Sequence, residues 1–150
     1  MQSLEEYKHD YLKKGFISPV RIISEGEAKK HRDLLENSEK IMGDMHYQSK
    51  LHTIFKSAYD LAVHPNILDI VEKAIGPNIL LHNTTYIIKE PQSAAFVSWH
   101  QDLTYWGFSH DDQISVWLAL STADDVSGAM YMIPGSHLEG KREHKTIKDK

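Results

Sequence analysis

Hydrophobic residues recur at helical spacing through the first half of the chain. The first such segment covers residues 4–14, and its apolar side chains are Leu4, Tyr7, Tyr11 and Leu12. This spacing places them on one face of an amphipathic helix, and Gly15 directly after the segment is typical of a helix end. The sequence therefore predicts a helix over residues 4–14, followed by a short extended stretch at Phe16–Ile23.

Three further helices are predicted before the pattern changes. Ser24 and Glu27 have the spacing of a capping box, in which each side chain bonds the backbone N–H of the other residue, so a helix should begin there and run to about Ile41. Two more helical patterns cover about Leu51–Val63 and Ile67–Ile75. A His-Pro pair separates them and a Gly-Pro pair closes the second, because proline interrupts a helix and glycine favours its end.

Extended segments replace the helical pattern after Gly76. Four segments are predicted as strands because they are apolar, short and bounded by turn residues. They are Ile79–Ile88, Ala94–His100, Ile114–Leu120 and Met130–Ile133. Helices followed by strands predict an α+β fold, with the N-terminal helices packed on a β-sandwich or jelly roll. We expect a single domain over residues 1–150, with a helical part at about 1–76 and a jelly-roll part at about 77–150.

The composition excludes several classes of function. No cysteine occurs among the 150 residues, so any bound metal must be held by nitrogen and oxygen atoms. The formal net charge of −4 gives no electrostatic reason to expect nucleic acid as a partner. The sequence has neither a run of about 20 apolar residues nor the features of a signal peptide, so we expect a cytoplasmic protein that does not enter a membrane.

The tripeptide His100-Gln101-Asp102 is a candidate metal-binding motif. In a strand, residues i and i+2 point to the same face about 6.5 Å apart, so an imidazole and a carboxylate can converge on one cation. Two histidines and one carboxylate on one face of Fe(II) leave positions open for a keto acid and O₂. His110 and Asp112 have the same spacing but lie among polar residues that are typical of a solvated loop. The apolar segment before His100 favours the first pair.

Several distinctive blocks of sequence surround this motif. They cover residues 76–80, 87–91, 98–106, 116–120, 128–130 and 134–137. In this order and spacing, the blocks resemble the phytanoyl-CoA dioxygenase family. The resemblance implies a double-stranded β-helix (a jelly roll), Fe(II) as the metal, 2-oxoglutarate and O₂ as cosubstrates, and hydroxylation of a small-molecule or acyl substrate.

The resemblance also assigns roles to individual residues. His100 and Asp102 match the first two iron ligands, and we name no catalytic residue beyond them. Trp117 matches a tryptophan that lies against the keto acid, Thr85 falls on a strand position that contacts the cosubstrate, and Lys50 matches a lysine near it. Asp102 also favours hydroxylation, because halogenases of the superfamily carry a small residue at that position.

Two parts of the family's site have no match in the chain. The third iron ligand and the arginine that pairs with the far carboxylate of 2-oxoglutarate should follow Pro134–His137. We therefore expect the jelly roll to be incomplete at its C-terminus. His137 and His144 are alternative third ligands, although their positions in the family pattern favour turn and surface roles. Arg142 lies too close to the Pro-Gly-Ser-His turn to be the expected arginine.

Three functions remain open from the sequence. The leading hypothesis is an Fe(II)/2-oxoglutarate-dependent dioxygenase in which Tyr105 and Trp106 form part of a substrate wall. The second is a non-catalytic jelly-roll binding module, or an inactive fragment lacking the distal histidine and arginine. The third, a zinc hydrolase, is weaker because the His-x-Asp motif lacks further ligands at the usual spacing. Neither the substrate nor the oligomeric state can be predicted.

Overall fold

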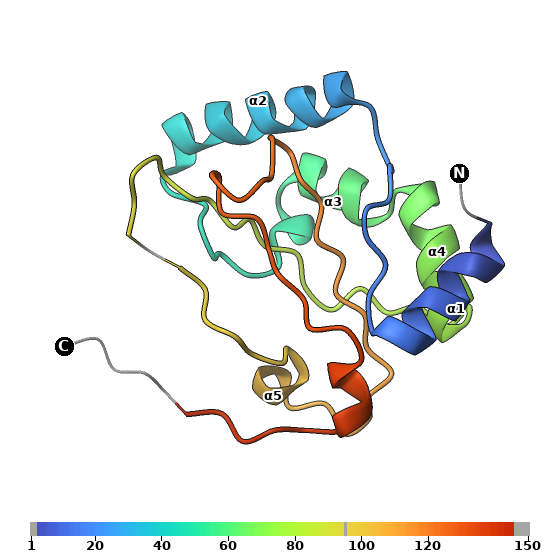
Figure 1. Ribbon diagram of the computed structural model, residues 1–150. Coiled ribbons are helices and arrows are strands. Elements are labelled where there is room, and N and C mark those ends of the chain that lie inside the picture. The colour runs from blue at the N-terminus through green and yellow to red at the C-terminus, as the bar shows by residue number, and fades with distance from the viewer. Residues whose placement is uncertain (1–2, 95, 146–150) are drawn as a thin grey trace.

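The computed structural model describes residues 3–94 and 96–145 of the chain. In chain order, its helices are α1 (Leu4–Lys14), α2 (Glu25–Met42), the 3-10 helix η1 (Leu51–Thr53), α3 (Lys56–Ala62), α4 (Pro65–Ile75), α5 (Leu103–Trp106) and the 3-10 helix η2 (Ser136–Glu139). Figure 1 shows α1 and α4 side by side, while most of the second half of the chain runs as loops. None of the helices described is both long and apolar enough to cross a membrane.

Both long N-terminal helices begin with a capping box. At α1 the backbone N–H of Glu6 donates to the hydroxyl of Ser3 at 3.3 Å, and the N–H of Ser3 donates to the Glu6 carboxylate at 2.6 Å. Ser24 and Glu27 make the same two bonds at the start of α2. These bonds satisfy N–H groups that have no partner within the helix. The helix predicted over residues 4–14 and the helix start predicted at Ser24 are confirmed.

After residue 50, the first predicted helix is divided into two shorter ones, whereas the second begins two residues earlier than predicted. The segment Leu51–Val63 is divided into η1 and α3, and α4 begins at Pro65. Proline is favourable in the first turn of α4, because the N–H that it lacks would have no partner in the helix. The N–H of Asn66, which follows Pro65, donates instead to Nδ1 of His64 at 3.2 Å. An ion pair between Glu5 and Lys73 joins α4 to α1.

The core lies between α2, η1, α3 and the segment around Tyr86. Its buried members are Leu35, Met45, Leu51, Ala58 and Tyr86, with Phe55, Ile88 and Leu120 packed against them. The Phe55 and Tyr86 rings meet edge to face with centroids 6.2 Å apart, an arrangement that aromatic pairs favour. Tyr86 thereby holds the loop that contains Thr85 against the helical half of the molecule.

The jelly roll predicted from the sequence is wrong for the residues that the structure describes. No segment within 3–94 or 96–145 forms a β-strand, and the isolated bridge found there joins His46 and Tyr86. The four segments predicted as strands run as loops, apart from Ala95, which lies outside the described residues. The fold is therefore helical in its regular structure, and the α+β prediction is corrected.

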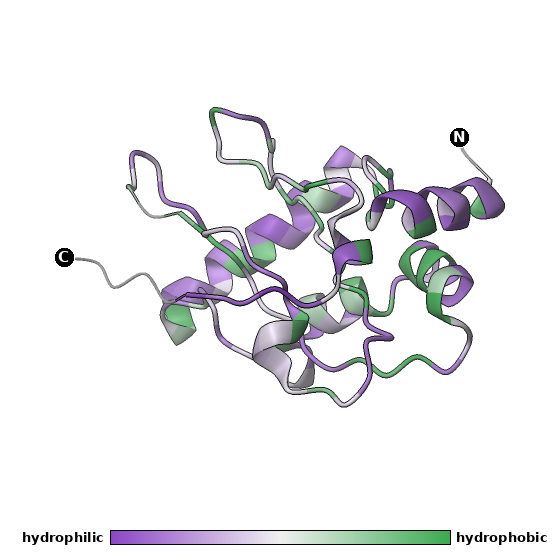
Figure 2. Cartoon of the chain, turned by 60° about the horizontal axis from the view of Figure 1, so that its bottom comes forward, coloured by the Kyte–Doolittle hydropathy of each residue, from purple (hydrophilic) through white to green (hydrophobic). Residues whose placement is uncertain are grey.

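The absence of paired neighbours explains this difference. Alternating apolar residues predict an extended backbone, whereas a strand also needs a ladder of hydrogen bonds to an adjacent strand. In the loops after residue 77, large apolar side chains remain exposed instead of packing between sheets, among them Leu80 (87%), Phe96 (75%) and Trp99 (66%). Figure 2 shows hydrophobic stretches along these loops as well as on the helices.

Candidate metal and cosubstrate site

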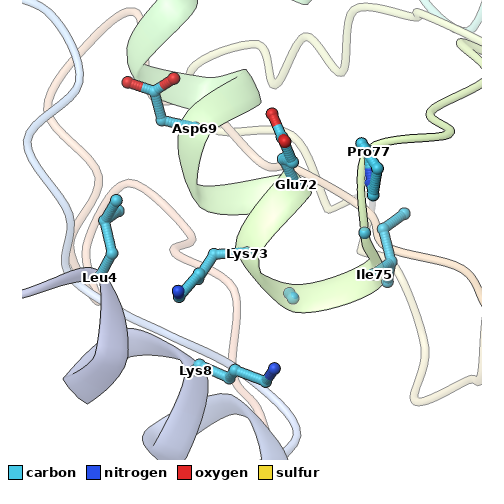
Figure 3. A pocket seen from close by; sticks show the side chains of 9 residues that line it. Leu4, Lys8, Asp69, Glu72, Lys73, Ile75 and Pro77 are labelled. Atoms are coloured by element: carbon cyan, nitrogen blue, oxygen red, sulfur yellow. The ribbon is translucent and has the colours of Figure 1, made fainter.

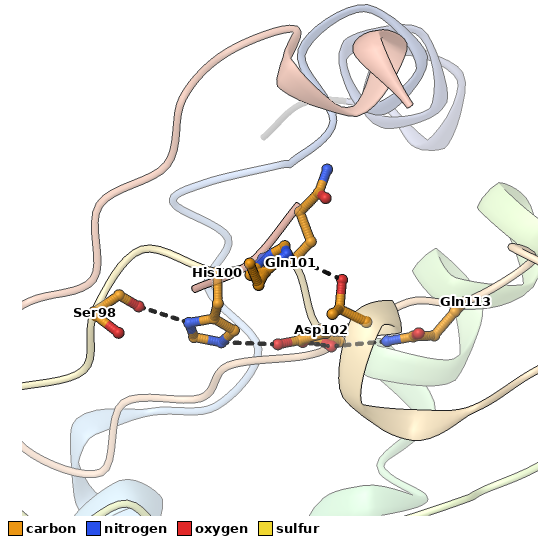
Figure 4. Close-up of polar contacts among 8 residues, drawn as sticks. Ser98, His100, Gln101, Asp102 and Gln113 are labelled. Atoms are coloured by element: carbon orange, nitrogen blue, oxygen red, sulfur yellow. Dashed lines mark hydrogen bonds and ion pairs between the residues drawn. The ribbon is translucent and has the colours of Figure 1, made fainter. Parts of the chain in front are cut away.

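His100 and Asp102 lie beside each other where the chain enters α5 (Figure 4). Nε2 of His100 is 3.1 Å from Oδ1 of Asp102, and the side chains are 35% and 37% exposed. The strand expected for His100 is replaced by a turn, and Asp102 already has helical backbone angles (φ −54°, ψ −46°) as the residue before Leu103–Trp106. A turn therefore brings together the two side chains that a strand was expected to align.

A hydrogen bond to Ser98 determines the tautomer of His100. Nδ1 of His100 lies 2.7 Å from the backbone carbonyl oxygen of Ser98. A carbonyl oxygen can only accept, so Nδ1 carries the proton and Nε2 of the neutral ring is a bare acceptor. Histidines that bind metals through one ring nitrogen nearly always donate the other N–H to a carbonyl or carboxylate in this way.

The bare Nε2 and the Asp102 carboxylate fit a shared cation. Two acceptors at 3.1 Å repel each other unless a proton or a metal ion lies between them. Two ligands at right angles, each about 2.1 Å from an octahedral cation, would be about 3.0 Å apart. The spacing of the His100 and Asp102 ligand atoms is therefore that of neighbouring ligands in an octahedral site.

Ser115 orients the carboxylate of Asp102. Its hydroxyl donates to Oδ2, the oxygen that does not face His100, and the side-chain amide of Gln113 lies 3.4 Å from the same hydroxyl. Each carboxylate oxygen of Asp102 therefore has a separate contact. We did not predict Ser115 from the sequence. The sequence feature that could have indicated Ser115 is its position two residues before Trp117, since alternate residues of an extended segment point to the same side.

The described residues supply two candidate ligands and no third. No group of three or more His, Cys, Asp or Glu side chains within residues 3–94 and 96–145 could hold a metal ion. His137 is engaged elsewhere, with Nε2 at 3.0 Å from the carbonyl oxygen of Leu12. His144 uses both ring nitrogens, because Nε2 accepts from the N–H of Gln101 and Nδ1 lies 2.8 Å from the carbonyl oxygen of Arg142.

An aromatic hollow of about 390 Å³ opens beside the His100–Asp102 pair. Its lining residues are Tyr47, Val97, Ser98, His100, Asp102, Tyr105 and Trp106. Trp106 also packs against Phe108 and His82, with ring centroids 6.1 and 5.5 Å away. Tyr105 and Trp106 therefore line a hollow beside the pair, while their role as a substrate wall stays a prediction. Tyr47 was not predicted, because its place depends on the contact between its loop and the backbone of Tyr86, whose carbonyl accepts the Tyr47 N–H at 3.0 Å.

Lys50 and Thr85, two of the predicted cosubstrate contacts, lie on neighbouring pieces of chain. The N–H of Lys50 donates to the Asn83 side chain at 2.6 Å, and the N–H of Leu51 donates to the carbonyl of Thr84 at 3.0 Å. The hydroxyl of Thr85 is buried and has no hydrogen-bond partner among the described residues. Such a group is costly to bury unless something else satisfies it.

Trp117, the third predicted cosubstrate contact, is 45% exposed and lies outside the residues that line the aromatic hollow. The structure therefore brings His100 together with Asp102 and Lys50 together with the Thr85 loop.

A second hollow of about 620 Å³ lies between α1 and α4 (Figure 3). Its charged lining residues are Lys8, Asp69, Glu72 and Lys73. Lys73 is paired with Glu5, and this ion pair is the main reason that the pKa of Glu5 is lowered. The mixed charges and the absence of histidine in this lining make it a poorer metal site than the His100–Asp102 pair.

Comparison with known proteins identifies the family. The sequence profile of phytanoyl-CoA dioxygenase (PhyH) matches residues 15–150. The chain belongs to the phytanoyl-CoA dioxygenase family. The resemblance seen in the sequence is confirmed, and the His100-Gln101-Asp102 motif lies within the matched range. No solved structure matches the chain significantly.

Curated relatives in this family are named as dioxygenases. The chain is 32% identical over 96 residues to a probable alpha-ketoglutarate-dependent hypophosphite dioxygenase of Stutzerimonas stutzeri, covering 64% of the chain and 33% of that protein. It is 33% identical over 93 residues to human peroxisomal phytanoyl-CoA dioxygenase, covering 59% of the chain and 28% of that protein. It is 22% identical over 152 residues to ectoine dioxygenase of Streptomyces avermitilis, covering 89% of the chain and 50% of that protein. The chain thus spans between about a quarter and a half of the length of these relatives.

Proposed function

We propose that this chain carries the first two metal ligands of an iron(II)/2-oxoglutarate-dependent dioxygenase that hydroxylates a small-molecule or acyl substrate. The observation that carries the proposal is the distance of 3.1 Å between Nε2 of His100 and Oδ1 of Asp102, with Nδ1 of His100 turned toward the carbonyl of Ser98. Family membership supports it, because the relatives named above are dioxygenases and one is named as alpha-ketoglutarate-dependent.

Each residue of the pair has a defined task in this proposal. His100 and Asp102 would hold the iron, while Ser98 and Ser115 fix the directions of the imidazole and the carboxylate. The bound iron, together with 2-oxoglutarate and O₂, would supply the oxidant that removes a hydrogen from the substrate. The protein's own contribution is to bind and orient these groups. No third ligand is named in this proposal, because no metal-binding group of three His, Cys, Asp or Glu side chains forms within residues 3–94 and 96–145.

Thr85, Lys50 and Trp117 are the proposed cosubstrate contacts. The Thr85 hydroxyl is an unsatisfied buried donor, which suits an oxygen of a bound keto acid. Lys50 is held close to this loop through Asn83 and adds a positive charge. Trp117 is proposed from its match to the family pattern, since the structure leaves it half exposed.

The substrate class stays broad in this proposal. The relatives are named for hypophosphite, phytanoyl-CoA and ectoine, which differ greatly in size and charge. The aromatic hollow lined by Tyr105 and Trp106 is the proposed place for the substrate. Asp102 favours hydroxylation over halogenation, because its carboxylate would take the coordination position that a halide needs.

The test is anaerobic addition of Fe(II) and then 2-oxoglutarate to the full-length protein. The charge-transfer absorption of an iron–keto acid chelate should appear, and succinate should form once O₂ is admitted. Asp102→Ala should remove both signals. His110→Ala and Asp112→Ala should leave them intact, because that second His-x-Asp pair lies in an exposed loop. If the wild-type protein binds Fe(II) but gives neither signal, the non-catalytic binding module is the better explanation.

A further inference from the structure

Gln101, the middle residue of the metal-binding motif, is bound on three sides by one distant segment. Its backbone N–H donates to Nε2 of His144 at 2.9 Å. Its side-chain amide donates to the carbonyl of Gly140 at 3.0 Å and accepts the N–H of Arg142 at 2.9 Å. The side-chain amide therefore makes both a donor and an acceptor hydrogen bond to the backbone of residues 140–142, as a neighbouring β-strand does.

His144 is held in one tautomer by these contacts. Because the N–H of Gln101 donates to Nε2, that atom carries no proton. Nδ1 must then carry the proton, and it lies 2.8 Å from the carbonyl oxygen of Arg142, which can only accept. Both ring nitrogens are engaged, so His144 supports the motif and is not free to bind a metal.

The remainder of this segment has few other attachments. Residues 140–145 contain no helix or strand, and the described residues there are exposed except for His144, which is half-buried. The ring of Tyr105 lies between the two histidines, with centroids 6.0 Å from His100 and 5.8 Å from His144. The segment thus touches the ligand pair through Gln101 on one side and through Tyr105 on the other.

We propose that Gln101 and His144 are positioning residues that clamp the turn between His100 and Asp102, so that metal affinity and the order of segment 140–145 depend on each other. The inference rests on the proposed metal site. Fixing the peptide between two ligand residues fixes the relative directions of their side chains. Thermodynamic linkage then requires that a bound metal stabilises the clamp by as much as the clamp stabilises the bound metal.

The clamp is tested by titrating the full-length protein with Co(II) under anaerobic conditions and measuring the visible absorption of the bound metal. Gln101→Ala and His144→Ala should each raise the Co(II) dissociation constant by about 10- to 100-fold, as supporting residues of metal sites do. His144→Gln should recover most of the affinity, because its amide oxygen can accept the N–H of Gln101. Gln48→Ala is the matched control, since this amide also donates to a loop carbonyl, that of Asp44, but does not touch residues 140–145.

Hydrogen exchange of residues 140–145 supplies a readout that does not depend on activity. Co(II) should slow exchange there in the wild type and in His144→Gln, but not in His144→Ala. The clamp would be overturned if Gln101→Ala and His144→Ala lowered only the Tm and bound Co(II) with dissociation constants within twofold of the wild type. The proposed metal site would not be affected by that result. A wild-type protein that binds no Co(II) would overturn the metal site and the clamp together.

Discussion

Nε2 of His137 donates to the carbonyl oxygen of Leu12 at 3.0 Å, across 125 positions of the chain. The last carbonyl groups of a helix have no partner within it, and a second one at the end of α1, that of Lys14, accepts the N–H of Gly135 at 2.8 Å. The Pro-Gly-Ser-His turn therefore closes the C-terminal end of α1.

Gly15→Ala should destabilise the protein through this contact. Gly15 has φ +83°, and a β-carbon there would clash with Nδ1 of His137. The left-handed backbone alone should cost roughly 1–2 kcal/mol in a residue other than glycine, and displacing the imidazole should cost about 1 kcal/mol more. Gly135→Ala is the control for strain alone, because Gly135 has φ +78° and nothing lies within 4 Å of its added carbon. If urea unfolding gave the same loss of free energy of unfolding for Gly15→Ala and Gly135→Ala, the His137 ring would move aside freely.

Thr85→Val should weaken binding of the cosubstrate without lowering the stability of the protein. The Thr85 hydroxyl is buried without a hydrogen-bond partner among the described residues, so replacing it with a methyl group should leave Tm unchanged or raise it. If the hydroxyl meets 2-oxoglutarate, the dissociation constant of the keto acid should rise about tenfold, the equivalent of one hydrogen bond of about 1.4 kcal/mol. Both quantities can be measured by anaerobic titration and thermal melting. A lower Tm with unchanged keto-acid affinity would make Thr85 a structural residue.

Ser115→Ala should weaken metal binding without removing it. The substitution leaves Oδ2 of Asp102 without its hydroxyl donor and lets the carboxylate rotate. A loss of about tenfold in Fe(II) affinity is expected, with recovery in Ser115→Thr, which keeps a hydroxyl. Calorimetry of anaerobic Fe(II) binding would measure this. Equal affinity in Ser115→Ala and the wild type would mean that the carboxylate is oriented by other groups.

His31 should make stability depend on pH. Nδ1 of His31 shares a 2.7 Å hydrogen bond with the buried Ser57 hydroxyl, which joins α2 to α3. Burial lowers the pKa of His31, although the nearby Asp60 opposes this shift. The unfolded chain therefore binds the proton at a higher pH than the folded protein. The contribution of neutral His31 to the free energy of unfolding is fully present above about pH 6.5, the ordinary pKa of histidine. It is lost as the pH drops below this value toward the folded-state pKa.

Urea unfolding between pH 7.5 and 5 would measure this dependence. His31→Gln should flatten the decline below pH 6.5, because the amide does not titrate there. His9→Gln is the control, since the His9 side chain is 76% exposed. An identical decline in the wild type and His31→Gln would assign the effect to other groups.

The helices could be predicted from the sequence because their signals are local. The capping boxes at Ser3 and Ser24 involve residues three positions apart, and Gly15 acts at its own position. Strands depend on partners far away in the chain, which alternation cannot supply. The segment Ile114–Leu120 has the apolar alternation of a strand yet forms a loop with Trp117 half exposed.

The candidate site was predictable only in part for the same reason. His100 and Asp102 are two residues apart, so a turn can bring them together as well as a strand. Ser115 and Tyr47 reach the site through contacts with residues far away in the chain, and their residue types gave no signal. His144 was considered as a third ligand from its residue type, but the sequence did not indicate its contact with Gln101. The prediction of one domain over residues 1–150 is untested, and so are the proposed roles of Lys50, Thr85 and Trp117.

Fe(II) binding by the full-length protein under anaerobic conditions tests the His100–Asp102 site most directly. Wild-type protein should bind one Fe(II), and His100→Ala or Asp102→Ala should each weaken that binding at least 100-fold, because each removes a ligand and leaves its partner unpaired. His110→Ala should bind Fe(II) as the wild type does. The metal assignment would be contradicted if His100→Ala and Asp102→Ala kept the wild-type affinity, for then the 3.1 Å contact would be a proton-bridged ion pair.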